Sequence, residues 1–184
     1  MKKYFPIYIA LAFLTILGVG QGMFNLFDLK ADATKTEKKI HTHYESLYSS
    51  LEVTTTKNKK IKFKEIKAPI VILNFWATWC KPCLIEFPSI VKMKEKYDDS
   101  KVQVFGINQD DEDQLKNIKK IEKKYKLNFP NVADVNGFIL EQYMVSAIPV
   151  SIIYHKGKVI QVSNGAKDFS SEEVYEKFDK LLKN

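Results

Sequence analysis

The chain has 184 residues, of which 45% are hydrophobic and 28% charged, and its formal net charge is +7 at pH 7. This length accommodates one ordinary domain with an appendage. All 29 basic residues are lysines, and they are spread along the whole chain. Arginine is the preferred group for bidentate recognition of phosphates and bases. The composition therefore argues against a nucleic-acid-binding protein.

The N-terminal segment is strongly apolar. No charged residue occurs from Tyr4 to Phe27, and about 20 apolar residues are enough to cross the hydrocarbon core of a bilayer. We predict a membrane anchor over residues 1–27. The alternative is a cleaved signal peptide, with a small-x-small site at Gly18-Val19-Gly20 or Ala31-Asp32-Ala33, which would release a secreted domain.

The orientation of the anchor does not follow from charge alone, because lysines lie on both sides of it. The very short N-terminal tail and a cysteine pair further along the chain both favour a globular part outside the cytoplasm. Residues 28–45 are polar and lysine-rich, without a sustained apolar period, which is typical of a tether with room for a helical turn or two. We expect the globular domain over residues 46–184.

The first half of this domain shows three local patterns. Two short β-type segments, 51–54 and 61–63, flank a polar turn and predict a hairpin. The continuous apolar run Ile70–Phe75 predicts a central strand that is buried on both faces. A helix should follow from the cysteine pair to about Tyr97, and a second buried strand should cover Val102–Ile107.

The second half begins with a helix whose first turn contains Asp111-Glu112-Asp113. A hairpin is predicted over 150–162. The capping box Ser170-Ser171-Glu172-Glu173 should open a final amphipathic helix. Strand–helix alternation followed by an antiparallel pair predicts an α/β fold, with a mixed sheet flanked by helices on both faces.

Cys80 and Cys83 are the only cysteines, and they lie at the junction between the predicted central strand and its helix. A sulfur at a helix N-terminus favours the thiolate, and a second cysteine three residues on faces the same side. Cys80 is the candidate nucleophile, because it lies nearer to solvent on any helix that starts there. Cys83 should be the resolving thiol, which attacks the mixed disulfide that Cys80 forms.

Two other roles for the pair are weaker. A structural disulfide would close so small a loop that it would stabilise the fold only slightly. A zinc site needs two further ligands, and the nearest candidates, His41 and His43, lie in the expected tether. We therefore expect redox chemistry, with no metal and no cofactor.

Several motifs together carry a family resemblance that covers roughly Val53 to Leu182. The chain resembles the thioredoxin superfamily and, within it, the membrane-tethered thiol–disulfide oxidoreductases of the TlpA/ResA type. The motifs are Asn74-Phe75-Trp76-Ala77-Thr78-Trp79-Cys80-Lys81-Pro82-Cys83, then Glu86-Phe87-Pro88, the segment from Phe129-Pro130 to Tyr143, and Val145-Ser146-Ala147-Ile148-Pro149.

The resemblance assigns a role to Glu86. In thioredoxin a buried aspartate at the strand position of Asn74 accepts the proton of the resolving thiol, and asparagine cannot titrate. Glu86 lies three residues after Cys83, on the same helix face. The resemblance therefore implies that Glu86 is the proton acceptor; the alternative is an ordinary exposed helix glutamate.

The resemblance also implies a docking surface. X-Pro bonds in folded proteins are only about 5–6% cis, but in this superfamily a cis proline faces the cysteine pair and the backbone before it pairs with substrate. This implies a cis peptide bond between Ile148 and Pro149. Trp79 would form the apolar rim of the same surface, and simple packing is the alternative for it.

These expectations combine into an extracytoplasmic, membrane-tethered disulfide reductase. Its partners would be disulfide-bearing protein substrates, with the cysteines of apocytochrome c as the favoured client, and a transmembrane thiol protein as electron donor. A Cu(I) chaperone is an alternative, because two thiolates bind a soft monovalent ion. A disulfide oxidase or isomerase is another. A peroxidase is disfavoured, because the proline and threonine expected ahead of a peroxidatic cysteine are not at matching positions.

Overall fold

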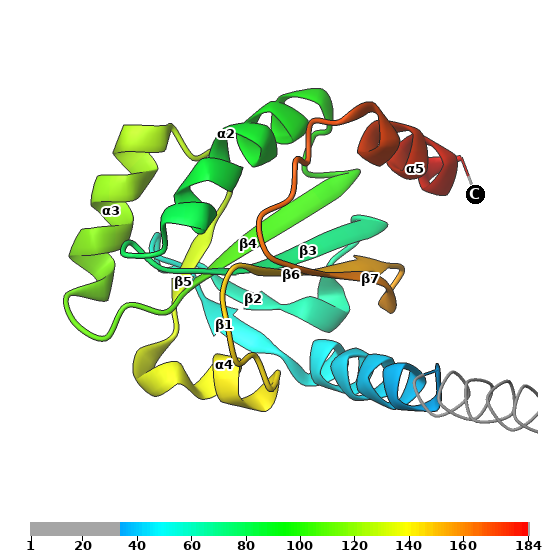
Figure 1. The fold of residues 1–184 in the computed structure, drawn as a ribbon, viewed down its shortest axis with the longest axis horizontal. Coiled ribbons are helices and arrows are strands. Elements are labelled where there is room, and N and C mark those ends of the chain that lie inside the picture. The colour runs from blue at the N-terminus through cyan, green and yellow to red at the C-terminus, as the bar shows by residue number, and fades with distance from the viewer. Residues whose placement is uncertain (1–33, 184) are drawn as a thin grey trace, which may run out of the picture. The chain divides into compact units, whose positions relative to one another are not determined.

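The computed structural model describes residues 34–183. Its centre is a five-stranded sheet in the order β5-β4-β3-β6-β7, which Figure 1 shows with helices on either side. The strands are β3 (Ile70–Trp76), β4 (Val102–Asn108), β5 (Asn131–Ala133), β6 (Val150–His155) and β7 (Lys158–Asn164).

The sheet is mixed, as the sequence predicts. β3 pairs in parallel with β4, with Ile70 opposite Val102, and antiparallel with β6, with Ile70 opposite His155. β4 and β5 are parallel, whereas β6 and β7 form an antiparallel hairpin. All seven residues of β3 are buried, so the prediction of a central strand covered on both faces is confirmed.

Four helices follow the strands, and three of them share one hydrophobic core. Side chains of α2, α3 and α5 pack together with the strand residues Ile70 and Ile72. In Figure 1 α2 and α5 lie on one side of the sheet and α4 lies on the other. The helices are α2 (Lys81–Lys96), α3 (Gln114–Tyr125), α4 (Phe138–Gln142) and α5 (Glu172–Leu182).

A small two-stranded sheet precedes β3. β1 (Glu52–Thr54) and β2 (Lys60–Lys62) form an antiparallel pair, which confirms the predicted N-terminal hairpin. One further bridge joins Thr55 to Val132 of β5. The hairpin therefore covers part of the edge strand β5, whose backbone groups would otherwise lie open to another chain.

The segment expected as a tether, residues 28–45, differs from that expectation where it is described. The chain divides into two compact units, Met1–His41 and Thr42–Asn184, and residues 34–50 are helical. In the second unit Tyr44 and Tyr48 are buried, one helical turn apart. Tyr44 stacks on Tyr143, and Tyr48 lies 4.6 Å from Tyr154 between ring centroids. Aromatic packing thus makes this part of the helix belong to the domain.

Two helix starts also differ from the sequence prediction. α3 begins at Gln114, and Asp113 is its N-cap in the left-handed region with φ 50°, so the acidic residues precede the first turn. α5 begins at Glu172 after Ser171, whose side chain makes no capping hydrogen bond. Ser170 donates its hydroxyl to Asp168 at 2.7 Å instead. The predicted capping box is therefore not formed.

No helix among residues 34–183 is long and apolar enough to span a membrane. The anchor predicted over residues 1–27, and the signal-peptide alternative, lie outside the described residues.

Candidate active site

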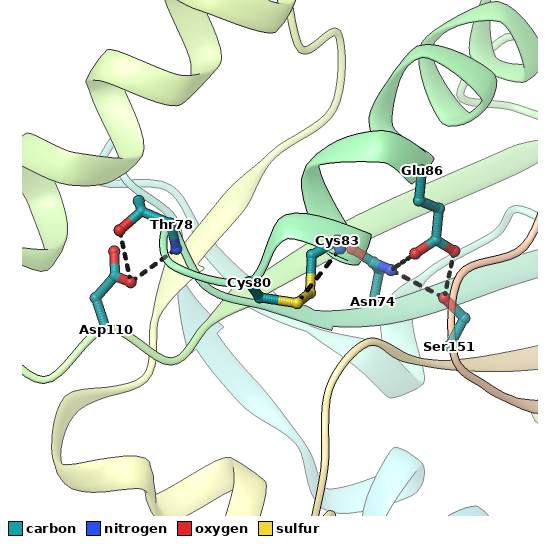
Figure 2. The surroundings of a disulfide bond; sticks show 7 residues. All are labelled: Asn74, Thr78, Cys80, Cys83, Glu86, Asp110 and Ser151. Carbon is teal, nitrogen blue, oxygen red and sulfur yellow. Dashed lines mark hydrogen bonds between the residues drawn. A yellow bond between two sulfur atoms is a disulfide. The ribbon is translucent and has the colours of Figure 1, made fainter.

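The two cysteines form a disulfide at the N-terminus of α2, directly after β3 and a short turn (Figure 2). Cys80 is the N-cap residue, and the Cys83 backbone N–H donates to its Sγ at 3.3 Å. Pro82 lies in the first turn, where no backbone N–H is needed. The two sulfurs therefore lie where the helix dipole and free N–H groups stabilise a thiolate.

Glu86 lies one turn further along α2, and only 2% of its surface is exposed. Its carboxylate accepts a hydrogen bond from Asn74 Nδ2 at 3.4 Å and from Ser151 Oγ at 3.5 Å. Burial raises the pKa of Glu86 to about 7, although hydrogen bonds from Asn74, the Lys167 backbone and Ser151 oppose the rise. The side chain is thus not an exposed helix glutamate, and it can exchange a proton near neutral pH.

Asn74 connects the buried carboxylate to the sheet. Its Nδ2 donates both to Glu86 and to Ser151 Oγ, the latter at 2.9 Å. Its Oδ1 is buried and has no hydrogen-bond partner among the described residues. Figure 2 shows this carboxamide between Cys83 and Glu86, with its nitrogen turned to Glu86. An acceptor therefore remains available on the side of Cys83.

Ser151 is a site residue that sequence reasoning missed. It lies on β6 opposite Asn74 of β3, and this pairing brings it to Glu86. The available signal was a serine within an otherwise apolar strand, since a buried hydroxyl needs a partner.

A second group of missed residues holds the turn before Cys80. Asp110 is 4% exposed and follows directly after β4. Its Oδ1 accepts hydrogen bonds from Thr78 N at 2.8 Å and from Thr78 Oγ1 at 3.0 Å (Figure 2). Its Oδ2 accepts one from Asn108 Nδ2 at 3.2 Å. A buried carboxylate with three donors thus ties the cysteine turn to the end of the neighbouring strand.

The expected docking residues lie together. The Ile148–Pro149 peptide bond is cis, as the resemblance implies, and Pro149 is buried while Trp79 is 68% exposed. Trp79 and Ile148 line the same groove, whose volume is about 630 Å³. Trp79 therefore does not simply pack in the core, and its indole is free to contact a ligand.

Among residues 34–183 no group of three or more histidine, cysteine, aspartate or glutamate side chains could hold a metal ion.

Solved structures with similar architecture define the class. StoA from Bacillus subtilis superposes with a TM-score of 0.59 at 23% identity, over 70% of this chain and 95% of that chain. A putative thiol:disulfide interchange protein DsbE from Chlorobium tepidum superposes with a TM-score of 0.62 at 25% identity. The match covers 72% of this chain and 92% of that chain. The protein therefore has the thioredoxin-like α/β fold.

Sequence relatives identify the family. The AhpC/TSA family model matches residues 47–163, and the chain belongs to this family. It is 38% identical over 124 residues to the thiol-disulfide oxidoreductase ResA of Bacillus thuringiensis subsp. konkukian (strain 97-27). This match covers 67% of this chain and 70% of the relative. It is 32% identical over 149 residues to the thioredoxin-like protein YneN of Bacillus subtilis (strain 168), a match that covers 80% of this chain and 84% of the relative. The protein is a thiol–disulfide oxidoreductase.

Proposed function

We propose that the protein is an extracytoplasmic, membrane-tethered reductase of protein disulfides that works through Cys80 and Cys83. One observation carries the proposal: the disulfide lies at the N-terminus of α2, beside a groove that begins at Trp79 and Ile148. The helix N-terminus favours the thiolate, and the groove offers a substrate a place next to it.

The first step is attack by the reduced enzyme. The Cys80 thiolate attacks one sulfur of the substrate disulfide, forms a Cys80–substrate disulfide, and releases the other substrate sulfur as a thiolate. Substrate backbone lies along the segment that precedes Pro149, with Trp79 against its apolar side chains. Trp79 lines the groove described above, Pro149 lines a neighbouring hollow, and Ile148 lines both.

The second step needs a thiolate at Cys83, which is 1% exposed. Glu86, with its pKa raised to about 7 by burial, accepts the Cys83 proton. In the reduced enzyme the Cys83 thiol donates to the unpartnered Asn74 Oδ1, which orients it. The Cys83 thiolate then attacks Cys80 Sγ, forms the observed disulfide, and releases the second substrate sulfur as a thiolate, which takes up the proton held by Glu86.

The oxidised enzyme must then be reduced again. We propose a transmembrane thiol protein as the electron donor, because the predicted anchor over residues 1–27 would hold the domain at a membrane surface. The cysteines of apocytochrome c are the favoured client, on the resemblance alone. The name of the ResA relative states thiol–disulfide oxidoreduction, and neither that name nor the name of YneN states a client.

The direction of the reaction is tested by the reduction potential. Equilibration with redox buffers, read by the fluorescence of the two tryptophans, should give a value nearer to that of thioredoxin, about −270 mV, than to that of the oxidant DsbA, about −120 mV. A reduction potential close to that of DsbA would show that the protein is an oxidase and contradict the proposed reductase.

The client is tested by trapping. A Cys83→Ala variant cannot resolve the mixed disulfide and should accumulate substrates on Cys80, whereas Cys80→Ala, the matched control, should trap none. Recovery of equal adducts from both variants would contradict the roles assigned to the two sulfurs.

A further inference from the structure

The groove beside the disulfide continues away from it. The first hollow, of about 630 Å³, begins at Trp79 and Ile148 and reaches Asp111, Gln114 and Asn136. These last three residues also line a second hollow, of about 840 Å³, between α3 and the β1–β2 hairpin. The two hollows are therefore neighbours that meet at these three residues, and we refer to them together as the channel, which begins at Trp79 beside the disulfide.

The outer part of this channel exposes apolar side chains. Leu115 of α3 and Val135, which follows β5, are 55% and 66% exposed, and both line the second hollow. Leu115 is an apolar residue in the first turn of α3, yet it does not pack in the core. Exposed aliphatic groups that line the same hollow are typical of a binding surface.

The charge of the channel is opposite to that of the protein. The first hollow is lined by three aspartates, Asp110, Asp111 and Asp134, and by no lysine or histidine, although the chain has a net charge of +7. Asp111 is exposed, and its carboxylate has no partner among the described residues. Lys116, the one cation of the second hollow, lies 3.7 Å from Asp113.

We propose that this channel binds an extended segment of the client protein that carries lysine or arginine beside its disulfide cysteine, with an apolar residue further along. Cationic side chains would meet Asp111 and Asp113, and the apolar residue would lie between Leu115 and Val135. The inference rests on the proposed function and adds the class of substrate. Anionic partners, such as lipid headgroups, are excluded from the channel by its charge.

The test uses three disulfide-bridged peptides with the same loop, flanked by lysines, by serines or by glutamates. The reduced protein donates two electrons and two protons to each peptide, and the rate is followed by tryptophan fluorescence. At low ionic strength the lysine peptide should react about tenfold faster than the glutamate peptide. This preference should disappear at about 1 M salt, where the screening length falls to about 3 Å.

Variants then locate the charge. Asp111→Asn with Asp113→Asn should reduce the preference to less than about threefold, and asparagine tolerates the left-handed conformation of residue 113. Glu95→Gln with Glu176→Gln is the matched control, because it removes two exposed carboxylates that do not line the channel, and it should keep the preference.

The results distinguish a failure of the channel proposal from a failure of the proposed reductase function. If the protein reduces all three peptides at one rate, or if the control pair abolishes the preference as fully as the channel pair, the channel proposal is wrong and the reductase stands. If the wild-type dithiol reduces neither the peptides nor a small aromatic disulfide, the reductase itself is wrong, and the substrate class proposed for it is wrong with it.

Discussion

Two buried carboxylates flank the disulfide, and they are held in different ways. Asp110 accepts three hydrogen bonds, of which the two from Thr78 are 3.0 Å or shorter. Glu86 receives two longer side-chain contacts, at 3.4 and 3.5 Å, and burial raises its pKa to about 7. The Asp110 carboxylate supports the turn that it contacts, whereas burial leaves the Glu86 carboxyl able to take up a proton near neutral pH.

The first prediction concerns the pH dependence of stability, which should change most when Glu86 is replaced. A pKa raised from 4.5 to about 7 corresponds to about 3 kcal/mol of unfolding free energy. Because the folded state holds the proton more tightly, this contribution is complete below pH 4.5 and is lost as the pH rises through 7. The unfolding free energy of Glu86→Gln, minus that of the wild type, should therefore increase by about 3 kcal/mol from pH 4 to pH 8.

The measurement is urea unfolding of the oxidised proteins across this pH range, since disulfide cysteines do not titrate. Glu95→Gln, on the exposed face of the same helix, is the control and should show no such increase. A difference that stays constant with pH would mean that Glu86 titrates alike in the folded and unfolded chains.

The second effect is on the rate of exchange. If Glu86 accepts the Cys83 proton, Glu86→Gln should slow resolution of the mixed disulfide by about 10²-fold. The attack by Cys80 should change much less. Stopped-flow kinetics with a chromogenic disulfide separates the two steps, and the titration of both cysteines by thiol alkylation should change as well. An unchanged resolution rate with unchanged cysteine titration would refute the role proposed for Glu86.

The sequence predicts Glu86 but not the contacts that set its proton affinity. β3 and α2 are encoded locally, by an apolar run and by a cysteine pair at a helix start, so the disulfide and Glu86 follow from neighbouring residues. Ser151 is 77 residues from Asn74 and 65 from Glu86. Only the pairing of β3 with β6 brings the three together, and a single sequence does not state which strands pair.

Long-range packing also explains why the sequence does not predict the helix over residues 34–50, at the start of the domain. Around Tyr44 and Tyr48 the segment is polar, and its helical character depends on rings supplied by Tyr143 and Tyr154, about 100 residues away in the chain. Isolated helices of this length are marginal in water. Tertiary packing, which composition does not reveal, therefore decides the structure of this segment.

The third prediction concerns Asp110. Asp110→Ala leaves the Thr78 N–H and hydroxyl without their acceptor, which should lower the unfolding free energy at pH 7 by about 2 kcal/mol. Thr78→Val removes only the hydroxyl donor and should cost about 1 kcal/mol. The double variant should lose less than the sum of the two, because the residues share one interaction. Additive losses would show that Asp110 does not stabilise the turn through Thr78.

The smallest effect concerns the Ser151 hydroxyl, one of the groups that donate a hydrogen bond to Glu86. The Ser151 hydroxyl opposes the rise in the pKa of Glu86, so Ser151→Ala should raise this pKa further, by less than about one pH unit. The midpoint of the pH dependence of unfolding reports the change. Ser163→Ala is the matched control, because Ser163 lies opposite Ser151 on β7 and its hydroxyl accepts from Gln161. A midpoint that moves equally in both variants, or that falls in Ser151→Ala, would mean that the carboxyl is governed by burial and Asn74 without the serine.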